Sequence, residues 1–205
     1  VRSYNAIFAD ELPYKTQDVR GWNLKPDILI HGSPCQDFSI AGRQKGADPN
    51  SGTRSSLMWE TIRIIQNMGV WKPRIVIWEN VKNVISKKHK HNYDNYCNKM
   101  SELGYISYGK VLNAKDYGIP QNRERVFTIS IRNDIDKEFI FPPKQELKLK
   151  LKDMLEDNVD EKYYLPDDRI EKILNSTFMQ EKKRIQTTDV CDTLLARDYK
   201  DPKCV

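Results

Sequence analysis

Cys35 is the residue of this chain whose setting most suggests chemistry. It lies in Ser33-Pro34-Cys35-Gln36, directly after the apolar run Asp27-Ile28-Leu29-Ile30-His31-Gly32. A β-branched run that ends in Gly and Pro is typical of a buried strand that gives way to a loop. Reacting groups collect beyond the carboxyl ends of strands in α/β sheets, and a thiolate there is a strong nucleophile. A lone cysteine is also a common small buried hydrophobe, so Cys35 alone leaves both interpretations open.

A carboxylate follows the second apolar run of the chain. The segment Arg74–Trp78, after Pro73, predicts a buried strand, and it ends in Glu79-Asn80-Val81. If the two predicted strands are parallel neighbours, Glu79 lies at the same sheet edge as Cys35. There it could act as a general acid or bind a heterocycle by hydrogen bonds. It could equally be an acid at the start of a helix, where the helix dipole favours negative charge.

A third group of polar residues follows in Gly118–Val126. Gln121, Arg123 and Arg125 alternate with other residues at the period of a strand, so their side chains point the same way in an extended segment. A row of donors on one face suits a phosphate or a carbonyl group. An edge strand with solvated charges is the commoner explanation for two such arginines alone.

Composition limits the class of protein. The chain has 205 residues, enough for one domain with a core, and its 39% hydrophobic and 31% charged residues indicate a globular protein. We expect no membrane span and no signal peptide, and hence a cytoplasmic protein. The net charge of +5 is compatible with a polyanionic partner. The four cysteines lack the spacing of a zinc site or a disulfide framework, so we expect no metal.

The apolar patterns alternate between strands and helices along the chain. This order favours βαβ units and a mostly parallel sheet flanked by helices, with a domain boundary near Pro142. A polar loop is expected at 42–53, and the tail of a helix at 1–8. The expected strands are 28–30, 74–78, 106–112 and 126–131, and the expected helices are 55–68, 93–103 and 167–174.

Other conspicuous side chains have ordinary structural explanations. His31 lies within the first predicted strand, so we expect a core histidine with satisfied hydrogen bonds. The basic tract Lys87–His91 predicts a solvated loop rather than a metal or nucleic-acid site. The tryptophans are expected to pack in the core or at its rim rather than to stack on bases, namely Trp22, Trp59, Trp71 and Trp78.

Taken in order, the three polar groups resemble the C5-cytosine-specific DNA methyltransferase family. Pro34-Cys35-Gln36, Glu79-Asn80-Val81 and Gln121–Arg125 match its fourth, sixth and eighth motifs. The residues between these motifs are also similar, and the resemblance covers about Asp18 to Asp134. Phe38–Gly46 resembles the mobile catalytic loop, Arg54 with Leu57-Met58 resembles the fifth motif, and 111–120 resembles the lead-in to the eighth.

The resemblance implies a Rossmann-like fold of the S-adenosylmethionine-dependent methyltransferases and transfer of a methyl group to C5 of cytosine in double-stranded DNA. It implies that Cys35 adds to C6 of a base flipped out of the duplex. Glu79 would engage N3 and the exocyclic amine, and Arg125 would bind O2. Arg123 would support the site or bind a phosphate.

The resemblance also implies the partners of the remaining site residues. S-adenosyl-L-methionine is the expected cofactor, and the source is expected to be a restriction-modification system or a phage, with the protein in the cytoplasm and on the nucleoid through DNA. The expected cofactor contacts are Asp18, Pro34 and Leu57, and the expected DNA contacts are Gln36, Ser39, Arg43, Lys45 and Gln121.

The sequence departs from the family at both ends. None of its nine glycines forms the Gly-x-Gly loop that holds the cofactor, and the acid that binds its ribose is not identifiable. Thr193–Tyr199 resembles the opening of the target-recognition region. We therefore expect a Rossmann-like domain incomplete at both ends, with 1–142 as the central catalytic part and 143–205 as a connecting segment into a truncated recognition region. By itself such a piece is expected to be inactive.

Three other functions stay open at this stage. The same chemistry could act on RNA, since RNA-directed members keep the recognition region short. The chain could be a non-catalytic fragment that binds nucleic acid weakly, as the absent Gly-rich loop suggests. An unrelated thiol hydrolase would need a histidine base near Cys35, and no histidine has the expected context.

Overall fold

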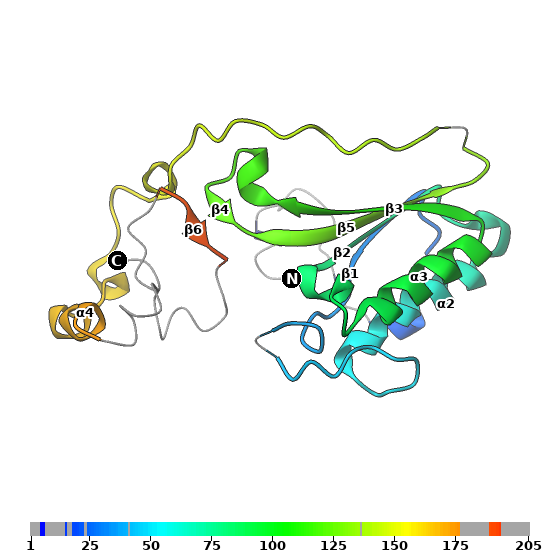
Figure 1. Ribbon diagram of the computed structural model, residues 1–205, viewed down its shortest axis with the longest axis horizontal. Helices are drawn as coiled ribbons and strands as arrows, with labels where there is room; N and C mark the ends of the chain where they lie inside the picture. The colour runs from blue at the N-terminus through cyan, green and yellow to red at the C-terminus, as the bar shows by residue number, and fades with distance from the viewer. Residues whose placement is uncertain are drawn as a thin grey trace. The chain divides into compact units, whose positions relative to one another are not determined.

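A computed structural model describes residues 5–6, 15, 18–22, 24–40, 42–135, 137–176 and 189–193 (Figure 1). The chain forms two compact units. The first contains Val1–Lys110 and Val126–Ile140, and the second contains Val111–Arg125 and Phe141–Val205. The predicted division into 1–142 and 143–205 is a statement about methyltransferase regions and stays a prediction.

The first unit contains a four-stranded sheet, and Cys35 follows its first strand. Its strands lie in the order β1-β2-β5-β3. β1 and β2 are parallel neighbours, with Ile28 opposite Ile75 and Gly32 opposite Glu79. The sequence predicted Cys35 and Glu79 at one sheet edge on the condition that these two strands are parallel neighbours, and the structure meets that condition. The strands are β1 (Ile28–Gly32), β2 (Ile75–Val81), β3 (Tyr105–Asn113) and β5 (Glu124–Arg132).

β5 runs against its two neighbours. The Arg132 amide at the end of β5 donates to the Arg74 carbonyl before β2, and the Asn133 amide donates to the Gly104 carbonyl before β3. Since β1 and β2 are parallel, β1, β2 and β3 point one way and β5 the other. The α/β class with a mostly parallel sheet is therefore confirmed, with one antiparallel strand that the sequence did not predict.

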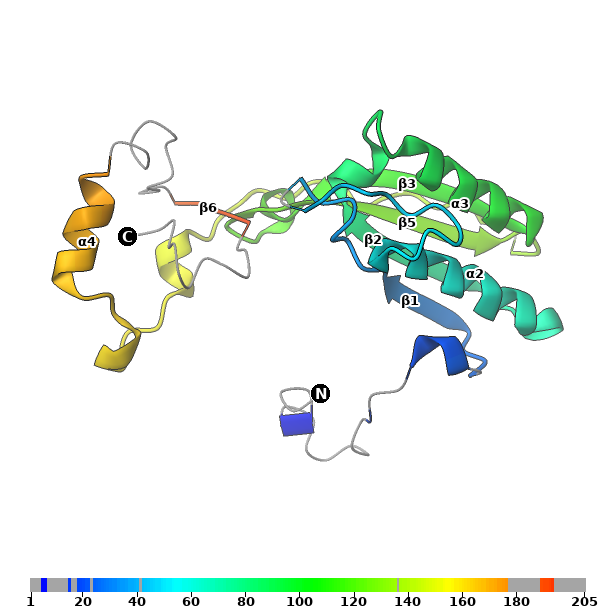
Figure 2. The same ribbon diagram turned by 90° about the horizontal axis from the view of Figure 1, so that it is seen from below.

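Two helices cover one face of the sheet (Figures 1 and 2). α2 (Met58–Asn67) continues the short turn η2 (Arg54–Leu57), and α3 (Lys90–Glu102) precedes β3. The predicted helices 55–68 and 93–103 are thus confirmed, although α3 begins earlier than expected. The remaining turns of this unit are η1 (Val19–Gly21), η3 (Gly69–Trp71) and η4 (Lys82–Ile85).

Aromatic side chains form the centre of this core. Trp78 is only 1% exposed and its ring stacks on His31, with centroids 6.1 Å apart, and lies 4.3 Å from Tyr96. His31 is satisfied as predicted, because its Nε2 lies 3.0 Å from the Tyr96 hydroxyl and its Nδ1 lies 3.1 Å from the Thr61 hydroxyl. Burial lowers the pKa of His31 to about 3, so the ring is neutral at physiological pH.

The other tryptophans differ in burial. Trp59 donates from Nε1 to the Ala47 carbonyl at 2.6 Å and so packs the polar loop against α2. Trp71 is 64% exposed and lies beneath the Lys25 ammonium, 5.4 Å from the ring centroid. Core packing is therefore confirmed for Trp78, whereas Trp71 lies on the surface.

The basic tract Lys87–His91 is not a wholly solvated loop, which corrects the sequence prediction. His89 is 1% exposed and is the N-cap residue of α3, although the lysines beside it are exposed. Its ring meets Phe38 edge-on, with centroids 5.4 Å apart. The charges of its neighbours hid this burial, because the tract lacks the apolar period of a core segment.

The second unit is built from short elements. β4 (Gln121–Asn122) pairs in parallel with β6 (Cys191–Asp192). The predicted helix at 167–174 is confirmed as α4 (Asp167–Leu174). The 3-10 turns are η5 (Ala114–Tyr117), η6 (Leu151–Met154) and η7 (Glu161–Tyr163).

Some predictions concern residues beyond the described ranges. Of the expected helix tail at 1–8, only residues 5–6 are described, and of the recognition text Thr193–Tyr199 only Thr193 is. Within the described segments, none of the helices has the length and apolar character to cross a membrane.

The pH dependence of folding tests the burial of His31. Its pKa falls from 6.5 to about 3 on folding, so below pH 6.5 the unfolded chain binds a proton that the folded chain does not. The free energy of unfolding should therefore fall as pH decreases, with His31 contributing up to about 1.4 kcal/mol per pH unit within this window. Urea unfolding between about pH 7 and pH 5 measures the slope.

A His31→Gln variant removes this titration. Its free energy of unfolding should vary less steeply with pH over the same interval. A slope equal to that of the unsubstituted chain would contradict the burial of His31.

Candidate active site

Cys35 lies in a tight turn beyond the carboxyl end of β1, as the sequence predicted. The amides of Phe38 and Ser39 both donate to the Cys35 carbonyl, at 3.0 and 2.7 Å. The cysteine itself is half-buried. The turn therefore fixes the backbone of Cys35 while part of the residue stays accessible.

Ser55 holds the chain on both sides of Cys35. Its hydroxyl donates to the Pro34 carbonyl at 2.6 Å and accepts the Asp37 amide at 3.2 Å. Its own amide donates to the Asp37 carboxylate at 3.1 Å. Ser55 is fully buried in the turn η2, which leads into α2. The position of the thiol thus depends on the first turn before α2.

A second anchor joins the end of β1 to the end of β2. The Asn80 side-chain amide donates to the hydroxyl and the carbonyl of Ser33, at 3.0 and 3.3 Å. The Trp78 indole donates to the same hydroxyl at 3.0 Å. Asn80 is 2% exposed, and its carbonyl oxygen accepts the Val81 amide at 2.8 Å. Both strand ends are therefore fixed relative to each other.

Glu79 lies at the same edge, on the opposite face of β2 from Trp78 and Asn80. It is half-buried and opposite Gly32 in the β1–β2 register. A Cβ placed on Gly32 would lie 3.6 Å from Glu79 Oε2, so the carboxylate extends over the strand that leads to Cys35. The structure thus brings the predicted acid and the predicted nucleophile to the carboxyl ends of adjacent parallel strands.

An open pocket lies beside the Cys35 turn. Its volume is about 550 Å³, and its lining includes the cationic side chains of Arg43, Lys45 and Arg54, together with Gln36 and Asp37. Three cations around one hollow favour an anionic ligand, and phosphate oxygens suit arginine in particular. Ser39, the other predicted DNA contact of this loop, is half-buried.

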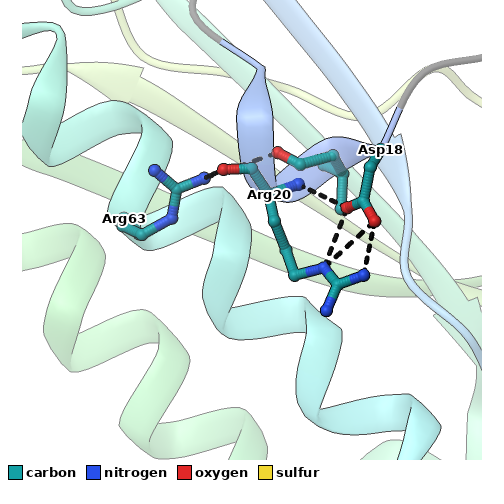
Figure 3. A network of polar contacts seen from close by, with 4 residues as sticks. Asp18, Arg20 and Arg63 are labelled. Carbon is teal, nitrogen blue, oxygen red and sulfur yellow. Dashed lines mark hydrogen bonds and ion pairs between the residues drawn. The ribbon is translucent and has the colours of Figure 1, made fainter.

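Asp18 caps the turn η1 and pairs with Arg20 (Figure 3). The Asp18 carboxylate accepts the Arg20 amide at 2.9 Å and both Nε and Nη2 of the guanidinium, the latter at 2.5 Å. These bonds lower the pKa of Asp18 to about 2. Arg63 of α2 donates to the Arg20 carbonyl at 2.8 Å, and so attaches η1 to the helix.

The remaining predicted cofactor residues belong to the same unit. Leu57 ends η2 and is 37% exposed, and Pro34 precedes Cys35 with its carbonyl held by Ser55. The Asp18 carboxylate is a pure acceptor with room for more than one donor, so it fits the exocyclic amine of an adenine, although Arg20 uses part of that capacity. Their roles stay predictions.

The predicted row of donors lies in the second unit. Gln121, Arg123 and Arg125 are half-buried, whereas Asn122 and Glu124 between them are exposed. This alternation is the one that a strand produces, but β4 ends at Asn122 and β5 begins at Glu124, so the shared face of the three side chains stays a prediction.

Side-chain caps fix this second segment. The Arg123 amide donates to the Asn113 side-chain oxygen at 3.0 Å, and the Asn113 amide group donates to Asn122 at 2.8 Å. Gly118 ends η5 in the left-handed region at φ 87° and lets the chain turn into β4. One guanidinium nitrogen of Arg125 donates to the Glu124 carbonyl at 2.7 Å. No cluster of three or more potential metal ligands occurs in the parts of the chain that the structure describes.

The sequence did not reveal Asp37 and Ser55 as parts of the site. They lie 18 positions apart, and neither belongs to a periodic pattern. The available signal was the Asp37 carboxylate itself, an acceptor directly before the polar loop that can bond backbone amides.

Comparisons with known proteins agree on one family. The model of the C-5 cytosine-specific DNA methylases matches residues 1–201. The chain is 49% identical over 166 residues to the type II methyltransferase M2.ScrFI of Lactococcus lactis subsp. cremoris, covering 79% of the chain and 45% of that protein. It is 42% identical over 149 residues to the type II methyltransferase M.HhaI of Haemophilus parahaemolyticus, covering 72% and 41%. The chain thus spans about half the length of these curated relatives.

Solved structures show the same fold. A DNMT2 mutant from Spodoptera frugiperda matches with a TM-score of 0.69 at 19% identity, covering 100% of this chain and 61% of that one. The methyltransferase EhMeth of Entamoeba histolytica matches with a TM-score of 0.67 at 20% identity, covering 97% and 60%. The fold is therefore that of the S-adenosylmethionine-dependent methyltransferases.

The Asp18–Arg20 pair makes a prediction about titration. An Arg20→Ala variant loses the guanidinium bonds and should raise the pKa of Asp18 from about 2 toward the ordinary 3.8. Arg63→Ala, which leaves the pair intact, should not produce this rise. Titration followed by NMR of the Asp18 carboxyl carbon measures both, and an unchanged pKa in Arg20→Ala would show that the pair does not form.

Proposed function

The chain belongs to the C-5 cytosine-specific DNA methylase family, and on that premise we propose that it takes part in methyl transfer from S-adenosyl-L-methionine to C5 of cytosine in DNA. The observation that carries the proposal is the setting of Cys35. Ser55 holds its two flanks, and the register of β1 and β2 brings Glu79 to the same edge. The activity is that of a DNA (cytosine-5-)-methyltransferase.

Cys35 supplies the nucleophile in this proposal. Its thiolate adds to C6 of the cytosine, and the electron pair of the C5–C6 double bond makes C5 nucleophilic. C5 then takes the methyl group. Loss of the C5 proton to a base returns an electron pair to the ring, and the bond between sulfur and C6 breaks to release the thiolate. Covalent catalysis thus divides one difficult substitution into several easier steps.

Glu79 and the arginines stabilise the changing charge on the ring. The Glu79 carboxyl group engages N3 and the exocyclic amine, and a proton at N3 favours addition of the thiolate at C6. Arg125 donates to O2, where negative charge accumulates, and Arg123 supports the site or binds a phosphate.

S-adenosyl-L-methionine supplies an electrophilic methyl group when it is bound. We propose that Asp18 accepts the adenine amine, that Leu57 forms a wall beside the base, and that Pro34 contacts the cofactor next to Cys35. The Arg63 bond to the Arg20 carbonyl would orient η1, and with it Asp18, toward that ligand.

Double-stranded DNA is the proposed substrate, with the target base flipped out of the stack. Arg43 and Lys45 of the pocket, with Gln36, Ser39 and Gln121, would contact the backbone and the opened site. We propose a cytoplasmic restriction-modification or phage enzyme that associates with the nucleoid through DNA. Within it, 1–142 forms the central catalytic part and 143–205 leads into the recognition region.

Covalent trapping tests the role of Cys35. The protein expressed from its whole reading frame should form a stable adduct with DNA that carries 5-fluorocytosine, because fluorine at C5 cannot leave as a proton does. Cys35→Ala should abolish the adduct, whereas Cys97→Ala, which alters a half-buried thiol in α3, should retain it. An adduct that persists in Cys35→Ala would overturn the assignment of Cys35 as the nucleophile. An adduct on RNA but not on DNA would overturn the assignment of DNA as the substrate.

Steady-state kinetics test the groups around the base. Glu79→Gln and Arg125→Ala should each slow methyl transfer about 10²-fold or more, as expected when one acid or donor is lost from such a site. Glu102→Gln changes an exposed carboxylate that pairs with Lys99 on α3, and should leave the rate near normal. Turnover of Glu79→Gln or Arg125→Ala equal to that of Glu102→Gln would contradict their roles.

A further inference from the structure

The loop that follows Cys35 begins and ends against the same buried histidine. At its start, the fully buried Phe38 meets the His89 ring at an interplanar angle of 79°. At its end, Gly46 adopts φ +77°, and a Cβ placed on it would lie 3.5 Å from His89 Nδ1. His89 therefore packs against both ends of the Phe38–Gly46 loop.

The next turn of α3 holds the segment that leaves the loop. Asn92 is 1% exposed, and its side-chain amide donates to the Asp48 carboxylate at 3.3 Å. The same oxygen of Asp48 lies 2.8 Å from His91 Nε2. A Cβ on Gly46 would also lie 3.6 Å from the Asn92 side-chain nitrogen. Residues at the start of α3 thus contact the chain at Gly46 and bond it at Asp48.

Hydrogen bonds close the loop at this place. The Gly46 amide donates to the Asp37 carbonyl at 3.0 Å, and the Asn83 side chain donates to the Phe38 carbonyl at 2.6 Å. Between these ends, Arg43 and Lys45 are exposed and line the cationic pocket. The loop therefore has fixed ends and carries its charges on the accessible part.

We propose that His89 and Asn92 are positioning residues: His89 packs against both ends of the Phe38–Gly46 loop, Asn92 holds the chain at Gly46 and Asp48 where it leaves the loop, and together they set the position of Cys35. Their link to the thiol is short, because the Phe38 amide donates to the Cys35 carbonyl and a shift of Phe38 displaces that turn. The importance of this anchoring for catalysis rests on the proposed function. The anchoring itself is a property of the folded chain.

The His89 ring is suited to packing because it is uncharged. Burial lowers the pKa of His89, and its electrostatic interactions with Lys88 and His91 act in the same direction, whereas Asp48 opposes them. A neutral aromatic ring can meet the Phe38 ring edge-on without the cost of burying a charge. Phenylalanine at this position would keep that contact.

Limited proteolysis of the chain with trypsin tests the anchoring. Cleavage after Arg43 and Lys45 should be about tenfold faster in Asn92→Ala, the change expected when one hydrogen bond of ordinary net strength is lost. Asn95→Ala alters an exposed residue of the same helix and should cleave like the unsubstituted chain. His89→Ala should also accelerate cleavage, and His89→Phe should restore it.

Cleavage rates at sites outside the loop show whether a variant loosens the loop alone or unfolds the whole chain. Arg63 in α2 and Arg74 before β2 should be cleaved at unchanged rates in Asn92→Ala. Equal acceleration at these sites, or equal loop cleavage in Asn92→Ala and Asn95→Ala, would overturn the proposal. If His89→Ala fails to fold, the cleavage rates of Asn92→Ala and His89→Phe still test the proposal.

Covalent trapping extends the test to catalysis. In the protein from the whole reading frame, Asn92→Ala should slow adduct formation with 5-fluorocytosine DNA and leave the affinity for DNA unchanged. Faster proteolysis without slower trapping would overturn the positioning role. A protein that forms no adduct at all would overturn the proposed function, and the proteolysis result would still report on the anchoring.

Discussion

The hydroxyl group of Ser55 is the constraint on which the geometry around Cys35 depends. It donates to the Pro34 carbonyl and accepts the Asp37 amide, so one buried side chain holds the residues on both sides of the thiol turn. Leaving any of these polar groups buried without a partner would lower the free energy of unfolding of the chain. The site is therefore built as a turn fastened to η2, the turn that leads into α2, and its precision depends on packing of that helix against the sheet.

The sheet supplies the other half of the arrangement. Gly32 pairs with Glu79 in the β1–β2 register, and the Asn80 side chain fixes Ser33 from the end of β2. A shift of one residue in this register would turn Glu79 to the other face of the strand. The acid and the cysteine are thus positioned by the same strand pairing. The aromatic core around Trp78 in turn holds α2 and α3 on the sheet.

Much of this arrangement could be predicted from local sequence patterns. The apolar runs that end in Gly32 and Glu79 indicated parallel strands, and the rule for their carboxyl ends brought Cys35 and Glu79 together. The spacing of Gln121, Arg123 and Arg125 likewise agrees with their half-burial between exposed neighbours. Contacts between distant segments left no such pattern in the sequence. Examples are the Asp37–Ser55 bonds, the bond from Arg63 to the Arg20 carbonyl of η1 and the burial of His89. The reversed direction of β5 was also hidden, because the centre of β5 is a run of buried residues, the pattern that also marks a parallel strand covered on both faces.

Amide hydrogen exchange at Asp37 tests most directly whether Ser55 fixes the Cys35 turn. In Ser55→Ala the Asp37 amide loses its acceptor and should exchange faster. Ser56→Ala provides the matched control, because the adjacent hydroxyl bonds the Thr53 carbonyl rather than the turn, and exchange at Asp37 should stay as in the unsubstituted chain. Equal exchange of the Asp37 amide in the two variants would contradict the account.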